Sequence, residues 1–209
     1  WKIKSTHGSF LRVQDFMIVQ LINDLPKERP IYFAVTVSPE NRVGLDDYLQ
    51  MEGLVFKLKT LKVKNEKLNR SKMIQNITET PDYNNIIYNS EDYINYIESG
   101  DGVYRYKNLN NQNVFFNDNI QRLVQNYRSS FLQLGIETIY SENPDKNKET
   151  LNLLNKMEQY FPSEHLPMRN GDLEIQIGRM YKEAGDTKKY TDILDDLLNN
   201  EKTSFQDIF

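Results

Sequence analysis

Residues 31 to 37 read Ile-Tyr-Phe-Ala-Val-Thr-Val, and this stretch sets our expectation for the first part of the fold. β-Branched and aromatic residues dominate it, which is typical of a strand. Because apolar side chains fall on both of its faces, we expect a strand that is covered on two sides. The longest unbroken apolar run, residues 31 to 35, lies here and is far shorter than the roughly 20 residues of a membrane-spanning helix. The sequence thus predicts a water-soluble chain.

A helix is expected before this strand. Apolar side chains between Phe16 and Leu25 gather on one helical face, and Asp15 suits the first turn because helix N-termini favour acidic groups. Pro26 ends the pattern, since proline cannot continue a helix. The side chains of this face are Ile18, Leu21, Ile22 and Leu25.

A short helix and a second strand are expected after it. Leu45 to Glu52 can form two helical turns, and Gly53 fits the left-handed position that commonly ends a helix. Leu54 to Leu58 has the alternation of a half-exposed strand. The 16 residues between Val37 and Leu54 suffice for a crossover, so we expect the two strands to be parallel neighbours.

The segment from Lys62 to Asn117 shows no steady period and holds 12 Asn and six Tyr in 56 residues. We expect a short helix at Ser90 to Ile97, with Gly100 shortly after its end, and irregular structure elsewhere. Tyrosines interleaved with Asn suit a polar aromatic surface for a ligand such as a sugar. The alternative, which we favour, is that these rings pin the segment to the core.

Beyond Asn117 the apolar pattern becomes helical. Asp118 can cap a first helix, Asn143-Pro144-Asp145 turns the chain into a second that Pro162 closes, and Gly185-Asp186 separates a third from a fourth. Four helices joined by short turns make two antiparallel hairpins. Their apolar stripes are Ile120, Leu123, Val124, Tyr127, Phe131 and Leu134; Leu151, Leu154, Met157 and Phe161; Leu173, Ile177, Met180 and Tyr181; and Tyr190, Ile193, Leu194 and Leu197.

The second hairpin resembles a tetratricopeptide repeat. Ile177-Gly178, Tyr181 and Gly185-Asp186 stand at the spacing of that consensus, and Leu134-Gly135 occupies the matching place 43 residues before Ile177-Gly178. Gly178 would let the partner helix approach closely, and Gly185 would make the turn. Two imperfect repeats are fewer than the three or so of a free-standing solenoid, so we expect them to lean on the α/β part.

These patterns predict an α+β fold that is mostly α. It comprises a small α/β layer with two parallel strands, followed by two antiparallel tetratricopeptide-like hairpins. We divide the chain into an α/β subdomain at residues 1–61, an Asn/Tyr-rich irregular connector with a short helix at 62–117, and a helical subdomain at 118–209.

Composition excludes several classes of function. The chain has no Cys, so thiolate metal sites, Cys nucleophiles and CxxC redox chemistry are impossible. Its 26 basic and 30 acidic side chains give a net charge of −4, which argues against a nucleic-acid partner. His7 and His165 have no HxxxH or HExxH context, so we expect surface or packing roles rather than metal ligation. Phosphate-loop and GxSxG motifs do not occur.

A few carboxylates are the residual candidates for chemistry. Asp46, Asp47 and Glu52 could divide acid and base duties or hold a cation, but carboxylates near a helix start are usually dipole partners, and we adopt that interpretation. Asp145 to Glu149 lacks the central Gly of a calcium loop and is discarded. Asn76-Ile77-Thr78 is a formal N-glycosylation acceptor. The sequence therefore assigns no catalytic, cofactor-binding or metal-ligating residue and predicts no cofactor.

Two sets of residues carry a family resemblance. The first comprises Leu11-Arg12-Val13-Gln14-Asp15, Arg29-Pro30-Ile31-Tyr32-Phe33-Ala34-Val35-Thr36-Val37, Gly44-Leu45, Tyr48-Leu49 and Glu52-Gly53-Leu54. The second is Asn126-Tyr127-Arg128-Ser129-Ser130-Phe131, preceded by Asp118. Over residues 10–61 and 114–200 the chain resembles the tail, after the last membrane span, of a bacterial family of multi-spanning membrane proteins. That family is similar to protein O-mannosyltransferases, with the GT-C glycosyltransferase architecture.

The resemblance implies a role by position. In GT-C enzymes the catalytic carboxylate lies in an early extracytoplasmic loop and a lipid-linked sugar is the usual donor. This chain would then be a non-catalytic C-terminal domain on the periplasmic side of the inner membrane. It would lie beside the membrane-spanning part of the same protein and position a protein or glycan acceptor. Arg128 is expected to pair with a neighbouring carboxylate rather than bind substrate.

Two rivals come from other classes. An independent helical-repeat module would bind a peptide or partner protein in the groove of its paired helices. A soluble sugar-processing enzyme would use Asp46, Asp47 or Glu52. The opening at Trp1, with neither Met nor a signal segment, favours a piece of a longer protein. The sequence specifies neither the sugar donor nor the oligomeric state.

Overall fold

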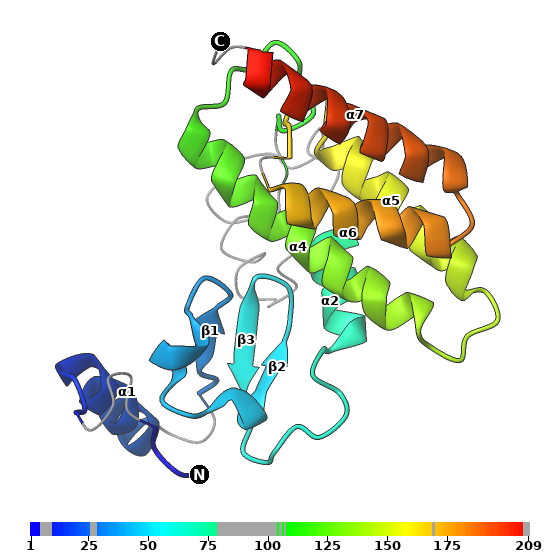
Figure 1. Ribbon diagram of the computed structural model, residues 1–209. Helices are drawn as coiled ribbons and strands as arrows, with labels where there is room; N and C mark the ends of the chain where they lie inside the picture. Colours follow the sequence, from blue (N-terminus) through cyan, green and yellow to red (C-terminus); the bar gives the residue numbers. More distant parts are fainter. Residues whose placement is uncertain are drawn as a thin grey trace, which may run out of the picture. The chain divides into compact units, whose positions relative to one another are not determined.

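The computed structural model describes residues 1–4, 10–25, 29–78, 104, 106, 108–168 and 170–206 of the chain. Within these residues the fold is α+β and mostly helical, with six α-helices and one three-stranded sheet, as Figure 1 shows. The chain divides into two compact units, Trp1–Met73 (unit 1) and Ile74–Phe209 (unit 2). The sheet belongs to unit 1 and the four longest helices belong to unit 2.

The sheet of unit 1 is small and antiparallel. Its strands are β1 (Tyr32–Ala34), β2 (Leu49–Met51) and β3 (Val55–Leu58), and β3 lies between the other two. Phe33 of β1 and Met51 of β2 both stand opposite Phe56 of β3. Because residues opposite each other share a face, these three side chains lie on the same side of the sheet.

The expectation of parallel strands is wrong, and Gly53 shows why. Gly53 has φ +97° and lies with Leu54 in a two-residue turn between β2 and β3, across which the amide of Glu52 donates to the carbonyl of Val55 at 2.8 Å. A turn of two residues joins antiparallel strands only. The residues assigned to a crossover thus contain an unpredicted strand, β2, and β3 runs opposite to both of its neighbours.

The two helical turns expected at Leu45–Glu52 are largely wrong for the same reason. Two short 3-10 helices, η1 (Pro39–Arg42) and η2 (Asp46–Tyr48), precede β2. Arg42 donates from Nε and Nη2 to the carbonyl of Val37, at 2.9 and 2.7 Å, and its guanidinium lies 4.5 Å from the centre of the Phe56 ring. These two hydrogen bonds hold η1 against Val37, three residues after the end of β1.

The strand expected at Ile31–Val37 is shorter than predicted and is not covered on two sides. Only residues 32–34 form β1, and the Val37 amide turns back to the carbonyl of Ala34. Phe33 is 8% exposed, whereas Tyr32 is 45% exposed. An antiparallel sheet needs cover on one face only, so an apolar run on both faces did not require two covering layers.

The helix predicted before the strand is confirmed as α1 (Val13–Asp24), which begins three residues early. Asp15 is fully buried and accepts a hydrogen bond from the amide of Arg12 at 2.8 Å, which satisfies a free N–H at the start of the helix. Ile18 and Ile22 pack on the core of unit 1. That core comprises the buried Phe33, Leu45 and Leu49, with Phe56 and Leu58 packed against them.

One helix was not predicted. α2 (Arg70–Thr78) lies within the segment expected to be irregular. The Oδ1 atom of Asn69 accepts from the amide of Lys72 at 3.3 Å, and Met73 and Ile77, one turn apart, are fully buried. An Asn followed by this apolar pair was the available signal. The helix expected at Ser90–Ile97 falls outside the described residues.

The four helices predicted after Asn117 are confirmed as α4 (Asp118–Ile139), α5 (Lys146–Tyr160), α6 (Gly171–Glu183) and α7 (Thr187–Gln206). Asn117, rather than Asp118, caps α4 by accepting from the amide of Ile120 at 3.1 Å. α4 packs on α5, α6 packs on α7, and α6 also contacts α4 and α5. The helices therefore form two hairpins, which Figure 1 shows in green to red.

Two glycines act as their spacing predicts. A Cβ on Gly178 would lie 3.3 Å from Tyr190 and 3.4 Å from Ile193, so α6 and α7 approach closely at this point. Gly185 has φ +104°, a conformation that residues with a side chain rarely adopt, and it makes the turn between the two helices.

Candidate functional site

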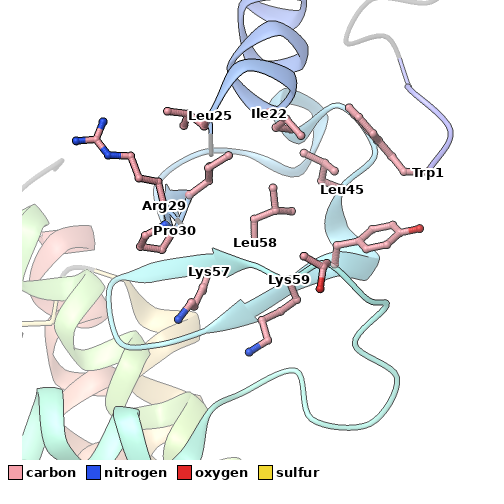
Figure 2. Close-up of a pocket in the computed structure, with 12 residues that line it drawn as sticks. Trp1, Ile22, Leu25, Arg29, Pro30, Leu45, Lys57, Leu58 and Lys59 are labelled. Carbon is pink, nitrogen blue, oxygen red and sulfur yellow. The ribbon is translucent and has the colours of Figure 1, made fainter. Parts of the chain in front are cut away.

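An apolar hollow of about 640 Å³ lies between α1 and the sheet in unit 1. Ile22 of α1 and Leu25, the residue after its end, line one side, and Leu45 and Leu58 line the opposite side. Figure 2 shows Leu58 at the centre, with the side chains of Ile22, Leu25 and Leu45 gathered around it. Trp1, Tyr48, Pro30 and Ile31 complete its apolar wall. The hollow forms because α1 covers the sheet without filling the space above Leu58.

Three cationic residues border this hollow: Arg29, Lys57 and Lys59. In Figure 2 the ammonium groups of Lys57 and Lys59 point away from its centre, as alternation along a strand requires when Leu58 faces inward. The Nζ of Lys57 lies 5.9 Å from the centre of the Tyr32 ring. The described lining residues include no carboxylate and no imidazole. Their chemistry suits binding of an apolar group in cationic surroundings better than acid–base catalysis.

The carboxylates Asp46 and Asp47 each have a cationic partner on the surface of unit 1. Asp46 lies 3.2 Å from Arg42, and Asp47 lies 3.0 Å from Lys62. The hydrogen bond and charge of Lys62 hold the pKa of Asp47 below its usual value, so this group stays ionised. A carboxylate that stays ionised has no proton to donate, so Asp47 does not suit the acid half of an acid–base pair.

Glu52 lies apart from this pair in a different environment. It is 6% exposed and accepts a hydrogen bond from Nδ2 of Asn69 at 3.0 Å. Asn69 also caps α2, so Glu52 helps to fix the start of that helix. The three candidate carboxylates thus have three separate side-chain partners: Arg42, Lys62 and Asn69.

A smaller polar hollow of about 300 Å³ adjoins η2. Lys2, Lys4, Lys62, Asp46 and Asp47 contribute its charged groups. Gly44, also in its wall, has φ +81°, and a Cβ there would come within 2.9 Å of the carbonyl of Lys2. The hollow is therefore a seam between the first residues of the chain and the η2 loop.

Arg128 in unit 2 is fully buried, and the pairing expected for it is wrong. Its Nη2 donates to the carbonyls of Phe161 and Leu166, at 2.8 and 2.5 Å, rather than to a carboxylate. Glu158 and Glu174 favour its charge only at longer range, while burial lowers its pKa to about 10. Arg128 therefore fastens the α5–α6 connector to α4.

The tyrosines that the structure describes in the Asn/Tyr-rich segment face the core. Tyr106 is 5% exposed, its hydroxyl donates to the carbonyl of Ile77 at 3.0 Å, and its ring lies 4.8 Å from that of Phe161. Tyr104 meets the ring of Tyr127 edge-on at 5.9 Å. For these two residues the pinning role holds, and the other four tyrosines lie outside the described residues.

Of the two histidines, His165 lies in the part of the chain that the structure describes. His7 lies outside the described residues, and the ring of His165 meets that of Phe116 edge-on at 5.6 Å. Across the part of the chain that the structure describes, no group of three or more His, Asp or Glu side chains is arranged to hold a metal ion. The Asn143 Nδ2 donates to Glu149 at 2.9 Å, so the acidic stretch at Asp145 forms the start of α5.

The formal glycosylation triplet lies in α2 rather than in a loop. Thr78 is 5% exposed and its hydroxyl donates to the carbonyl of Ile74 at 2.7 Å. A glycosylation acceptor normally occupies an exposed loop, so this helical setting disfavours modification of Asn76. None of the helices in the described residues has the length and apolar character needed to cross a membrane.

Comparison with known proteins bears on unit 1. Residues 1–80 match the family model described as TMEM260-associated domain 2. The family is tied to TMEM260, an O-mannosyltransferase-like protein, so the match indicates a membrane glycosyltransferase-like parent. The match supports the likeness to an O-mannosyltransferase-like protein that the sequence suggested, without its bacterial or GT-C details. The helices α4 to α7 lie beyond the matched residues. No curated protein and no solved structure matches the chain.

Proposed function

We propose that this chain is a non-catalytic extracytoplasmic domain of a membrane-bound glycosyltransferase-like protein, where it positions a protein or glycan acceptor. The observation that carries the proposal is the match of residues 1–80 to TMEM260-associated domain 2. The environments of Asp46, Asp47 and Glu52 are consistent with it, because each carboxylate is held by a structural partner. The reacting groups would then belong to the membrane-spanning part of the same protein.

The family resemblance of the sequence supplies three further parts of the proposal: the architecture of the parent, the side of the membrane and the nature of the helical module. The parent would have the GT-C architecture, and this chain would lie on the periplasmic side of the inner membrane. α4 to α7 would form a tetratricopeptide-like module, for which the close approach at Gly178 and the turn at Gly185 are the supporting features. Grooves between paired helices commonly bind extended polypeptide, which suits a protein acceptor.

The test compares the full-length parent with a version that lacks this chain, in membranes supplied with a lipid-linked sugar. A short peptide acceptor should be modified by both proteins, because the reacting groups are retained. A folded protein acceptor should be modified at least about tenfold more slowly by the shortened protein, as loss of a positioning contact worth about 1.4 kcal/mol implies. Sugar transfer by the isolated chain, or equal transfer by both versions to the folded acceptor, contradicts the proposal.

One observation favours the second candidate, an independent helical-repeat module that binds a partner protein. A hollow of about 690 Å³ lies along α6 and α7, with Ile175, Leu194 and Leu197 in its wall and Leu198 55% exposed beside them. Leu194→Asp would abolish partner binding in this case while leaving any sugar transfer by a membrane parent intact. Sequencing the gene upstream of Trp1 discriminates between the two: many hydrophobic spans there would favour the first candidate.

A further inference from the structure

α1 exposes a large apolar face to solvent. We call the side chains of Phe10, Val13, Phe16, Met17 and Leu21 the outer face of α1. They are 77%, 75%, 59%, 66% and 49% exposed, respectively. Isolated exposed apolar residues are common, but these four on α1, with Phe10 just before the helix, amount to roughly 500 Å² of apolar side chain, a size at which an exposed patch is often functional.

The outer face cannot be turned inward by a rotation of α1. The opposite side of the helix is already engaged, because Ile18 and Ile22 pack on the core of unit 1. Asp15 is fully buried beneath the first turn, where it holds the amide and the guanidinium of Arg12 at 2.8 and 3.6 Å. Rotation of α1 would expose Ile18 and Ile22 and would take the buried carboxylate of Asp15 away from its partners, so the outer face is held toward solvent.

Charge on the helix and around it selects the kind of partner. α1 carries only two charged residues, Asp15, which is buried, and Asp24, which is the last residue of the helix. Unit 1 as a whole contains 13 Lys and Arg against 8 Asp and Glu, a net charge of +5, whereas unit 2 contains 13 against 22, a net charge of −9. The net charge of −4 for the whole chain is therefore the sum of a basic unit and a more strongly acidic one. The exposed apolar helix belongs to the basic unit.

A second copy of the chain fits this face less well than a lipid surface does. A stable dimer interface needs about 800 Å² from each partner, and the outer face supplies roughly 500 Å². A basic unit also repels its own copy. An anionic bilayer attracts it, and the bilayer needs no shape complementarity to bury apolar side chains.

We propose that unit 1 docks on an anionic lipid surface through the outer face of α1. Phe10, Val13, Phe16 and Met17 enter the boundary between headgroups and acyl chains, and α1 lies parallel to the surface. The net charge of +5 on unit 1 supplies the long-range attraction, and the acidic unit 2 is kept in water. This deepens the proposed function, since it rests on a parent in the membrane and specifies which surface of the domain meets it.

Vesicle sedimentation with the full 209-residue chain tests the proposal. We expect binding to vesicles that combine phosphatidylcholine with about 30 mol % phosphatidylglycerol, and weaker binding to phosphatidylcholine alone or at high salt. The double variant F16Q/M17Q should lose affinity by about thirtyfold or more, because two large apolar side chains no longer enter the bilayer. Phe115→Gln is the matched control, since Phe115 is 89% exposed but belongs to unit 2.

The absence of Cys allows a second readout with a single label. Val13→Cys and Phe115→Cys are each modified with a polarity-sensitive dye. The fluorescence of the dye at position 13 should shift to shorter wavelength on addition of anionic vesicles, and that of the dye at position 115 should not. This readout places the outer face in the bilayer independently of total affinity.

Three outcomes overturn the proposal. They are no binding of the unmodified chain to anionic vesicles, equal binding by F16Q/M17Q and F115Q, and a dimer in solution that F16Q/M17Q dissociates without any vesicle binding. The last result would assign the outer face to a second copy. None of these measurements involves sugar transfer, so failure here leaves the acceptor-positioning role standing, and failure of that role leaves vesicle binding intact.

Discussion

Unit 1 and unit 2 bury their apolar side chains to very different degrees. In unit 2, Phe131, Phe161 and Tyr181 are at most 2% exposed. In unit 1, α1 has apolar residues on both of its sides. The side that faces the sheet borders a hollow, and the opposite side is exposed to solvent. The difference shows that unit 2 is organised around its own core, whereas unit 1 retains apolar surface that its own fold does not use.

The largest effect should come from a matched pair of phenylalanines. Phe131→Ala in α4 should lower the free energy of unfolding of unit 2 by about 3–5 kcal/mol, because it empties a fully buried site. Phe16→Ala in α1 should lower that of unit 1 by less than about 0.5 kcal/mol. Urea unfolding followed by far-ultraviolet circular dichroism, and by the fluorescence of the single residue Trp1 for unit 1, measures both. Equal losses would remove the contrast between the units.

The next effect sharpens the account of unit 2. Arg128→Met should lower the free energy of unfolding by about 2–4 kcal/mol, because the carbonyls of Phe161 and Leu166 lose their buried donor. Arg122→Met on the same helix is the control, since Arg122 is exposed. If the two variants unfold at the same urea concentration, Arg128 does not fasten the connector.

A pair of glycines compares backbone geometry in the two units. Gly44→Ala should cost about 2–3 kcal/mol, because φ is +81° and the added Cβ would come within 2.9 Å of the Lys2 carbonyl. Gly185→Ala should cost about 1 kcal/mol, since φ is +104° but no atom lies within 4 Å. Thermal unfolding of each variant measures the cost. A larger loss at Gly185 would contradict the close approach of the first residues to Gly44.

The smallest effect concerns the pH dependence of unit 2. Burial, and then the charge of Asp196, raise the pKa of Glu174 above its ordinary value of 4.5. The folded state therefore holds this proton more tightly than the unfolded state, and the group costs stability as pH rises through its raised pKa. Glu174→Gln should gain about 0.5 kcal/mol at pH 7 and nothing below pH 4. An unchanged pH profile would show that Glu174 is fully solvated.

Helices were more predictable than strands because their signal is local. The apolar stripes that end at Leu134, Phe161, Tyr181 and Leu197 were read from the sequence, and all four helices formed. β2 has only three residues, Leu49 to Met51, and its pairing depends on partners elsewhere in the chain. Gly53 has the same left-handed preference at a helix end as in a hairpin turn, so it did not distinguish the two.

The candidate site was less predictable than the fold. Leu25, Leu45 and Leu58 are ordinary core positions in the sequence, and only the distance between α1 and the sheet makes them the wall of a hollow. The pairing of Arg128 was missed because carbonyl oxygens carry no sequence signal. The outer face of α1 was missed because Leu21 was grouped on one face with Ile18 and Ile22, which pack on the core, whereas Leu21 is 49% exposed.

The sequence by itself determined α4 to α7, the closing role of Pro162 and the close approach at Gly178. These follow from side-chain period and backbone preference, which are local properties. Only the tertiary structure decided the antiparallel sheet, the partners of Arg128 and which face of α1 is left in solvent. Each of these depends on groups far apart in the chain, and burial is a property of the packed molecule rather than of any one segment.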